Sequence, residues 1–276
     1  MTMKPVESLD QYKALVKETK AQHPGTLTNS IQLAASMAPY IDEKRLFFAE
    51  WPQGIAFFLD ERTWYEVTFF WDPAEAPADF RQEKPVIAST YPRGGEPGAV
   101  GAFLEQAGFR KYRTNMQIEM ALTPDKDVTE AVGDKIRQAE EQGFTFRYCE
   151  DDALMERVLE LWDTNLELGD IPVDHRRRHP SDKTLCVFHG EKLAAVNWWR
   201  NTKGSSEVRH TVTHPDYYHR GLASAMLIFW CRDAARSGCK KAIGWIDDTN
   251  IRSFGLYGKA GFTVNGRCSV QYVLGE

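Results

Sequence analysis

The stretch Val212–Ala223 constrains the fold of this chain more than any other feature. Its β-branched start, its Pro215 turn and its Gly221 are followed by apolar side chains at helical spacing over Ser224–Arg236. This pattern predicts a strand that passes through a turn into the N-terminus of a helix. Unpaired backbone N–H groups and the helix dipole favour an anion there, and Gly221 with Ala223 would let a pyrophosphate approach the main chain.

The residues that follow add a second pattern. Lys240–Ile246 predicts a strand, Asp247–Asn250 a turn, and Ile251–Ala260 a short helix that ends at Gly261. Phe262–Leu274 predicts a final pair of strands, because the dipeptide Asn265-Gly266 is typical of a hairpin.

The two patterns together resemble those of the GNAT superfamily of acyl-CoA-dependent N-acyltransferases. The resemblance covers about residues 144–276 and rests on the turn Pro215–Ala223 and on Asn250, Ser253, Tyr257 and Ala260-Gly261-Phe262. It implies acetyl-CoA as the cosubstrate and an α+β fold, with a mixed, mainly antiparallel sheet flanked by helices. The turn departs from the family pattern twice, since Tyr218 stands where Arg or Gln is usual and His219 where Gly is common.

The first half of the chain has the same order of elements in outline. Helical periodicity is followed by strand-like runs, a Gly/Pro-rich turn, a helix and a last strand: Leu9–Gln22, Thr28–Met37, Leu46–Trp51, Gly54–Leu59, Trp64–Trp71, Pro85–Tyr91, Pro92–Gly98, Val100–Ala107 and Asn115–Leu122. Ala107-Gly108-Phe109 matches Ala260-Gly261-Phe262, which indicates an internal repeat. The alternative is an unrelated α+β domain.

The predicted organisation is therefore a tandem. Residues 1–124 form a degenerate GNAT-like copy, residues 125–143 a linker helix, and residues 144–276 the catalytic domain. The first copy has no room between Trp71 and Pro85 for a phosphate-binding turn and its helix, so we expect it not to bind CoA. In the second copy we expect strands at Phe144–Tyr148 and Glu207–Thr213, a helix at Asp152–Leu166, and a hairpin of Leu185–Phe188 with Leu193–Trp199.

The resemblance also implies the residues that contact acetyl-CoA. Backbone N–H groups at Val212 and Thr213 would face the thioester, and the turn would bind the pyrophosphate. Asn250 and Ser253 would hold the pantetheine arm or cap the helix Ile251–Ala260. The set consists of Val212, Thr213, Tyr218, His219, Arg220, Gly221, Leu222, Ala223, Ser224, Asn250, Ser253 and Tyr257. Helix capping alone would also explain Asn250.

Acyl transfer to an amine needs a neutral nucleophile, donors for the oxyanion and an acid for the leaving thiolate. Tyr257 resembles the family's general acid, and the alternative is a buried tyrosine that satisfies a backbone group. Two residues are candidates for the base. Glu207 stands where some family members carry a catalytic glutamate, unless it is a solvated charge, and the imidazole of His210 suits the role unless it is structural.

Two runs are candidates for contact with the acceptor. The basic run His175–His179 would suit a carboxylate or phosphate on the acceptor, although most charge runs are solvated. Of Trp198 and Trp199, which face opposite sides of a strand, we expect at most one in the core. His175 and His179 lack a third ligand, so we expect no metal.

Composition sets the remaining expectations. A net charge of -5 disfavours nucleic acid, and five cysteines without CxxC spacing indicate reduced thiols. With no signal peptide or membrane span in the pattern, we expect a cytoplasmic monomer or homodimer. The predicted function is transfer of an acetyl group from acetyl-CoA to the primary amine of a small molecule by direct attack in a ternary complex. The alternatives are a non-catalytic CoA-binding or regulatory module and an aminoacyl-tRNA-dependent transferase.

Overall fold

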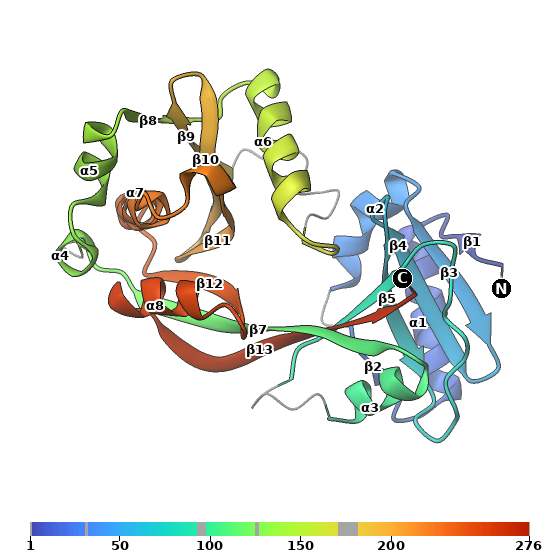
Figure 1. The fold of residues 1–276 in the computed structure, drawn as a ribbon. Helices are drawn as coiled ribbons and strands as arrows, with labels where there is room; N and C mark the ends of the chain where they lie inside the picture. The colour runs from blue at the N-terminus through green and yellow to red at the C-terminus, as the bar shows by residue number, and fades with distance from the viewer. Residues whose placement is uncertain (1, 31–32, 93–97, 125–126, 171–181, 276) are drawn as a thin grey trace. The chain divides into compact units, whose positions relative to one another are not determined.

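The computed structural model describes residues 2–30, 33–92, 98–124, 127–170 and 182–275. The chain forms two compact units (Figure 1). Unit 1 consists of Met1–Asn115 with Gly266–Glu276, and unit 2 of Met116–Asn265. The basic run His175–His179 lies outside the described residues.

Unit 1 is a sheet with helices on its two faces. Its elements are β1 (Lys4–Pro5), α1 (Leu9–Gln22), β2 (Leu27–Thr28), η1 (Ala34–Met37), α2 (Ala38–Asp42), β3 (Leu46–Trp51), β4 (Gly54–Asp60), β5 (Tyr65–Trp71), β6 (Val86–Thr90), α3 (Gly98–Gln106) and the start of β7 (Arg110–Ala121). Ser8 caps α1 by accepting from the Gln11 N–H. Phe70 of β5 packs in the cluster on the α1 face, while Phe69 contacts Phe103 of α3.

The helix expected over Thr28–Met37 is wrong. The described part of this segment holds the end of β2 and the single 3₁₀ turn η1. Long-range bonds decide this, because Asn29 is tied to β5 and β6 by its side-chain amide. The other expected strands and helices of unit 1 are confirmed within a few residues.

Unit 1 takes its last strand from the far end of the chain. In β13 (Thr263–Leu274), Val270–Leu274 pairs antiparallel with Thr90–Val86 of β6. Arg113 of β7 and Gln271 of β13 are hydrogen-bonded to each other in the same unit. The C-terminal residues therefore complete the sheet of unit 1.

Unit 2 has the sheet order β8–β9–β10–β11–β12–β7–β13. Its further elements are α4 (Thr129–Val132), α5 (Lys135–Glu141), β8 (Phe144–Tyr148), α6 (Asp152–Asn165), β9 (Asp182–His189), β10 (Lys192–Thr202), β11 (Ser205–Thr213), η3 (Pro215–Tyr217), α7 (Leu222–Arg236), β12 (Lys241–Asp247) and α8 (Ile251–Lys259). The expected linker helix over 125–143 is wrong, because its described part forms two short helices, α4 and α5, separated at Gly133 with φ 80°. The other elements match the expected ones closely, because apolar spacing was regular along most of them.

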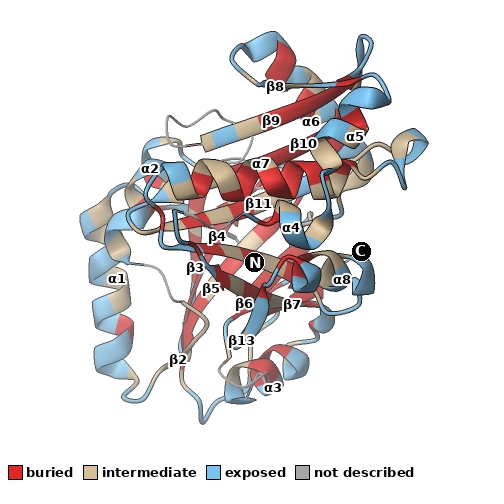
Figure 2. Ribbon diagram, turned by 90° about the vertical axis from the view of Figure 1, so that its left-hand side faces the viewer, coloured by how far each residue is buried: buried red, intermediate tan, exposed pale blue. Residues whose placement is uncertain are grey.

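Two cores lie on opposite faces of this sheet. One includes Leu154 and Trp162 of α6, and the other includes Met226 and Trp230 of α7 with Tyr257 of α8. Figure 1 shows α6 and α7 on the two sides of β9, β10 and β11. Figure 2 shows that α7 is largely buried, as expected for an apolar helix against a sheet.

Two expectations for unit 2 are wrong. Asn265-Gly266 does not turn the chain, because β13 runs without interruption from Thr263 to Leu274 and absorbs Gly266 at φ 79°. Trp198 and Trp199 are both core residues, 2% and 0% exposed, because each face of β10 carries a helix.

The mixed, mainly antiparallel sheet with flanking helices is confirmed. Parallel pairing occurs between β5 and β6 and between β11 and β12. The boundaries 1–124, 125–143 and 144–276 stay a prediction about the two copies. The structure adds that residues 116–121 belong to unit 2 and Gly266–Glu276 to unit 1.

Candidate active site

The parallel strands β11 and β12 of unit 2 pair over only part of their length. Ser205–Glu207 pairs with Lys241–Ile243, and the ladder ends there. β11 nevertheless continues to Thr213 and β12 to Asp247. The edge of β11 beyond Glu207 therefore has no ladder partner on the β12 side among the described residues.

A bulge in β11 aligns the two candidate bases. The register against β10 shifts between Trp198 and Trp199, so that Trp199 pairs with Val208 and Trp198 with His210. In a regular strand Glu207 and His210 would face opposite sides. The extra residue, Arg209, brings both onto the α6 face.

The surroundings of these two side chains differ. The Glu207 carboxylate is paired with the Arg209 guanidinium at 3.0 Å. The His210 ring stacks on Trp198 at 5.6 Å between ring centres and meets the edge of Trp162 at 5.6 Å. Both are partly exposed. The structure thus gives Glu207 a polar setting and His210 an aromatic one.

Tyr257 approaches β11 from the other face. Its ring packs against Trp230 and Phe262, with 6.4 Å and 5.1 Å between ring centres. Its hydroxyl is hydrogen-bonded to the Thr211 side chain, and burial raises the pKa of Tyr257 to about 12. The phenol is therefore neutral at physiological pH and holds its proton beside the part of β11 that β12 does not cover.

The bond to Thr211 is the first link of a polar chain. The Thr211 hydroxyl donates to Oδ1 of Asn197 at 2.7 Å, and Nδ2 of Asn197 donates to the Met226 carbonyl at 3.5 Å. Because the Thr211 proton is used in this way, Tyr257 is the donor to Thr211. The chain fixes the position of the phenol.

Backbone groups of β11 alternate between its two edges. The His214 N–H donates to Ala194 of β10 at 2.8 Å. Because strand N–H groups alternate, that of Thr213 points to the opposite edge, toward β12, while that of Val212 again faces β10. Of the two expected oxyanion donors, Thr213 is on the uncovered edge.

The turn after β11 has the geometry of an anion cradle. η3 covers Pro215–Tyr217, and Gly221 caps α7 in the left-handed conformation at φ 80°. The first intrahelical bond is from Ala225 to Gly221, so the N–H groups of Leu222, Ala223 and Ser224 have no partner within the helix. Tyr218, His219 and Arg220 are exposed.

His219 explains one departure from the family pattern. Its φ is 62°, in the region that glycine adopts without strain. The turn therefore keeps the backbone shape that a glycine would give, although the residue is a histidine. Histidine is among the non-glycine residues found most often in this region.

Asn250 caps α8 by accepting from the Ser253 N–H at 3.0 Å. The capping bond accounts for Asn250. Contact of Asn250 and Ser253 with a pantetheine arm stays a prediction. A turn precedes this cap, and in it the Asp247 carboxylate accepts from the Thr249 N–H at 2.9 Å.

Three residues of this region were not predicted from the sequence to belong to the site. Thr211 and Asn197 hold the Tyr257 hydroxyl, and an Asn inside the apolar run of β10 was the available signal. Lys135 of α5 lies beside the turn, since a side chain at Gly221 would meet its Cδ at 3.4 Å. Its Nζ donates to Gln138 at 2.8 Å. Nothing local in the sequence connected Lys135 to this turn.

Unit 1 contains a similar parallel pair, but its gap is filled. β5 and β6 pair only at Tyr65–Val86 and Glu66–Ile87, although β5 runs on to Trp71. Beyond that point β2 pairs with β5, and Asn29 donates to the Val67 carbonyl at 2.9 Å and the Ser89 carbonyl at 3.3 Å. Asn29 also accepts from the Phe69 N–H at 3.0 Å.

The described residues contain no cluster of three or more His, Cys, Asp or Glu side chains arranged to hold a metal ion. Within the same part of the chain, no helix has the length and apolarity needed to cross a bilayer. No disulfide joins the described cysteines, and Cys231 and Cys239 are buried in or just after α7.

Comparisons with known proteins bear on this site. Residues 137–262 match the model of the acetyltransferase (GNAT) family, a range that contains β11, the turn and Tyr257. No curated protein matches the chain.

Solved structures are similar over nearly the whole chain. A tandem GNAT protein from the clavulanic acid biosynthesis pathway has 12% identity and a TM-score of 0.57, covering 99% of this chain and 98% of that one. GCN5-related N-acetyltransferases from Kribbella flavida and Sphaerobacter thermophilus share 15% and 14% identity, each with a TM-score of 0.56. The alignments cover 88% and 99% of this chain and 96% and 95% of theirs. At these identities the likeness is one of fold, and it confirms the tandem GNAT architecture.

Proposed function

Since residues 137–262 match the model of the acetyltransferase (GNAT) family, we propose that the chain transfers an acetyl group from acetyl-CoA to the primary amine of a small molecule. The observation that carries this proposal is the early end of the β11–β12 ladder, with Tyr257 held beside the uncovered part of β11. Transfer is by direct attack of the amine in a ternary complex.

The described residues suit the proposed cosubstrate. The N–H groups of Leu222, Ala223 and Ser224, which have no partner within α7, provide donors for a pyrophosphate, with Gly221 before them. The gap between β11 and β12 provides an edge along which a pantetheine arm could bind to backbone groups. The thioester would then lie near Thr213 and Tyr257.

Tyr257 is the proposed acid. A neutral phenol, fixed by Thr211 and Asn197, can give its proton to the departing thiolate. The Thr213 N–H is the proposed donor to the oxyanion that forms on the carbonyl during attack. The Thr213 N–H lies on the uncovered edge of β11, and the Tyr257 hydroxyl lies beside that part of the strand.

The base is proposed to act from the α6 face. Glu207 and His210 both lie there because of the bulge at Arg209. Either can take a proton from the incoming ammonium, directly or through water, and the acceptor would then approach from the side opposite Tyr257. Of the two, Glu207 is paired with Arg209, and His210 carries an imidazole, the side chain most often used as a general base.

One experiment distinguishes the two alternative functions from the proposed one. A non-catalytic module would bind CoA without turnover, and an aminoacyl-tRNA-dependent transferase would not need CoA. Binding of acetyl-CoA is measured by calorimetry, and thiol release is followed across a panel of small primary amines.

We expect binding, and amine-dependent thiol release for part of the panel. Gly221→Glu is the variant that ties binding to the turn, because it places bulk and negative charge at the proposed phosphate site in a strained conformation. Wild-type binding without release from any amine would contradict the enzymatic proposal. Unchanged affinity in Gly221→Glu would contradict the assignment of the turn.

A further inference from the structure

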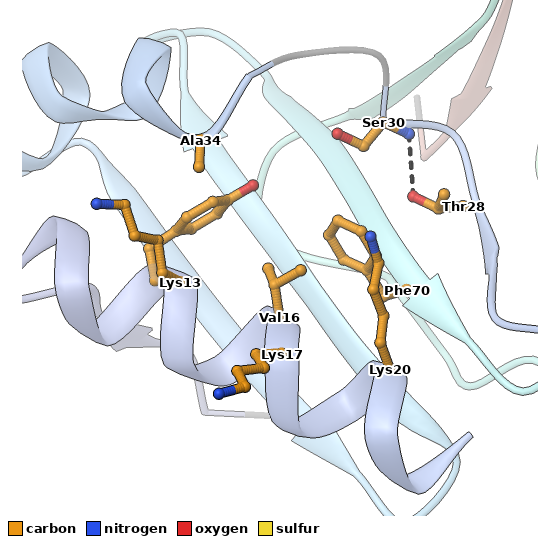
Figure 3. A pocket seen from close by; sticks show the side chains of 9 residues that line it. Lys13, Val16, Lys17, Lys20, Thr28, Ser30, Ala34 and Phe70 are labelled. Carbon is orange, nitrogen blue, oxygen red and sulfur yellow. Dashed lines mark hydrogen bonds between the residues drawn. The ribbon is translucent and has the colours of Figure 1, made fainter. Parts of the chain in front are cut away.

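Unit 1 has a groove on the α1 side of its sheet. Its volume is about 450 Å³, within the usual range for small-molecule pockets. One wall is α1, and Thr28, Ser30, Ala34 and Phe70 form the remainder. Figure 3 shows Ser30 and Ala34 across the groove from the lysines of α1, with Phe70 between them.

The charge of the lining is of one sign. Lys13, Lys17 and Lys20 line the groove from successive turns of α1, and no carboxylate lines it. Lys13 pairs with the exposed Asp10 at 3.6 Å, while Lys17 and Lys20 have no ion pair among the described residues. The Lys20 ammonium lies 5.0 Å from the centre of the Phe70 ring.

The lining of the groove also includes a tyrosine, Tyr12. Tyr12 is 4% exposed, and its ring packs on Phe57 with 4.6 Å between ring centres. Within the described chain its hydroxyl has no hydrogen-bond partner. Burial raises the pKa of this phenol, so it is a neutral donor. Tyr12 lines the groove, and a neutral donor beside cations without ion pairs favours an anionic acceptor.

We propose that this groove binds a small molecule with an aromatic or other apolar body and a carboxylate or phosphate group. The apolar body would lie against Val16 and Phe70, and the anion would accept from Tyr12 and pair with Lys20. Asn29 lies between Thr28 and Ser30, two residues of the groove, and closes the gap between β5 and β6. Unit 1 would then bind this ligand, while unit 2 has the proposed catalytic role.

The test is calorimetry with phenyl phosphate on the full chain. We expect saturable binding to the wild type, weakened about tenfold by Lys20→Glu through reversal of the charge. Tyr12→Phe should weaken it about fivefold, because only the donor is lost. Tyr12→Phe keeps the packing on Phe57, and its melting temperature checks the fold.

Two controls localise the effect. Lys111→Glu changes the net charge equally but lies outside the groove, so it should leave the affinity unchanged. Gly221→Glu alters only unit 2 and should also bind normally, which separates this inference from the proposed function. Absence of millimolar binding, or equal binding by wild type and Lys20→Glu, would overturn the proposal. Binding of anionic vesicles or oligonucleotides in place of phenyl phosphate would overturn it in favour of a macromolecular surface.

Discussion

Tyr257 is the residue on which the proposed chemistry depends most directly. Tyr257→Phe keeps the ring contacts with Trp230 and Phe262 but removes the transferable proton. We expect turnover to fall about 10²-fold or more, the usual contribution of a general acid, with the acetyl-CoA affinity nearly unchanged. Steady-state kinetics with calorimetry measures both, and full turnover in the variant would remove Tyr257 from the role.

The raised pKa of Tyr257 also predicts a pH dependence of stability. The folded pKa is about 12, above the value of 10.0 for an ordinary tyrosine, so folding favours the protonated form. Its contribution is fully present below pH 10 and is lost as pH rises from about 10 to 12.

The stability advantage of wild type over Tyr257→Phe should therefore shrink across that interval, as urea unfolding can show. The other tyrosines cancel in this difference. An advantage that stays constant up to pH 12 would show that burial does not hold the phenol neutral.

His219 predicts a second effect at residue scale. Its left-handed backbone strains a side chain with a Cβ, and glycine removes that strain. We expect His219→Gly to raise the free energy of unfolding by up to about 1 kcal/mol and to preserve acetyl-CoA affinity. Val at the same position is the contrasting variant and should destabilise. A loss of affinity in His219→Gly would instead give the imidazole a direct role in binding.

At the scale of elements, the parallel pair β5–β6 differs from the parallel pair β11–β12, because β2 and Asn29 fill the gap in the first pair. Asn29→Ala would leave two carbonyls and one N–H of β5 and β6 without their side-chain partner. We expect a loss of about 2 kcal/mol in the stability of unit 1, read from urea unfolding. Ser36→Ala, which removes an exposed side-chain bond to Leu33, is the matched control and should cost little. Equal effects of the two changes would show that Asn29 does not hold this gap closed.

Elements with regular apolar spacing were predicted well, including α1, α6, α7 and the strands β3 to β5. The errors fell where distant partners decide. Thr28–Met37 has helical spacing, but the bonds of Asn29 to β5 and β6 prevent a helix. Asn265-Gly266 has the composition of a hairpin, but both halves of β13 have strand partners that keep the chain extended.

At the scale of the whole molecule, the two units depend on residues far from their own sequence neighbours. Unit 1 needs the chain's last residues, where Val270, Tyr272, Val273 and Leu274 are buried. A chain truncated after Asn265 loses these side chains and the strand beside β6. The lost burial amounts to about 10 kcal/mol, comparable to the stability of a whole domain.

We expect unit 1 of the truncated chain to be unfolded and unit 2 to persist. Limited proteolysis with mass spectrometry should show early cuts within residues 1–115 and protection within residues 116–265. Removal of the last residue only is the control. Protection of residues 1–115 in the truncated chain would contradict the role of β13 in unit 1.

The sequence by itself determined the order of elements, the turn before α7 and the position of Tyr257 in its block, because these follow from local spacing, turn chemistry and motif. The tertiary structure decided that β11 and β12 separate after Glu207, that a bulge brings Glu207 and His210 to one face, and that Thr211 and Asn197 hold Tyr257. It also decided that β13 completes unit 1 and that Asn29 fills its gap. These are pairings between segments far apart in the chain, and their free energy depends on partners that local sequence patterns do not contain.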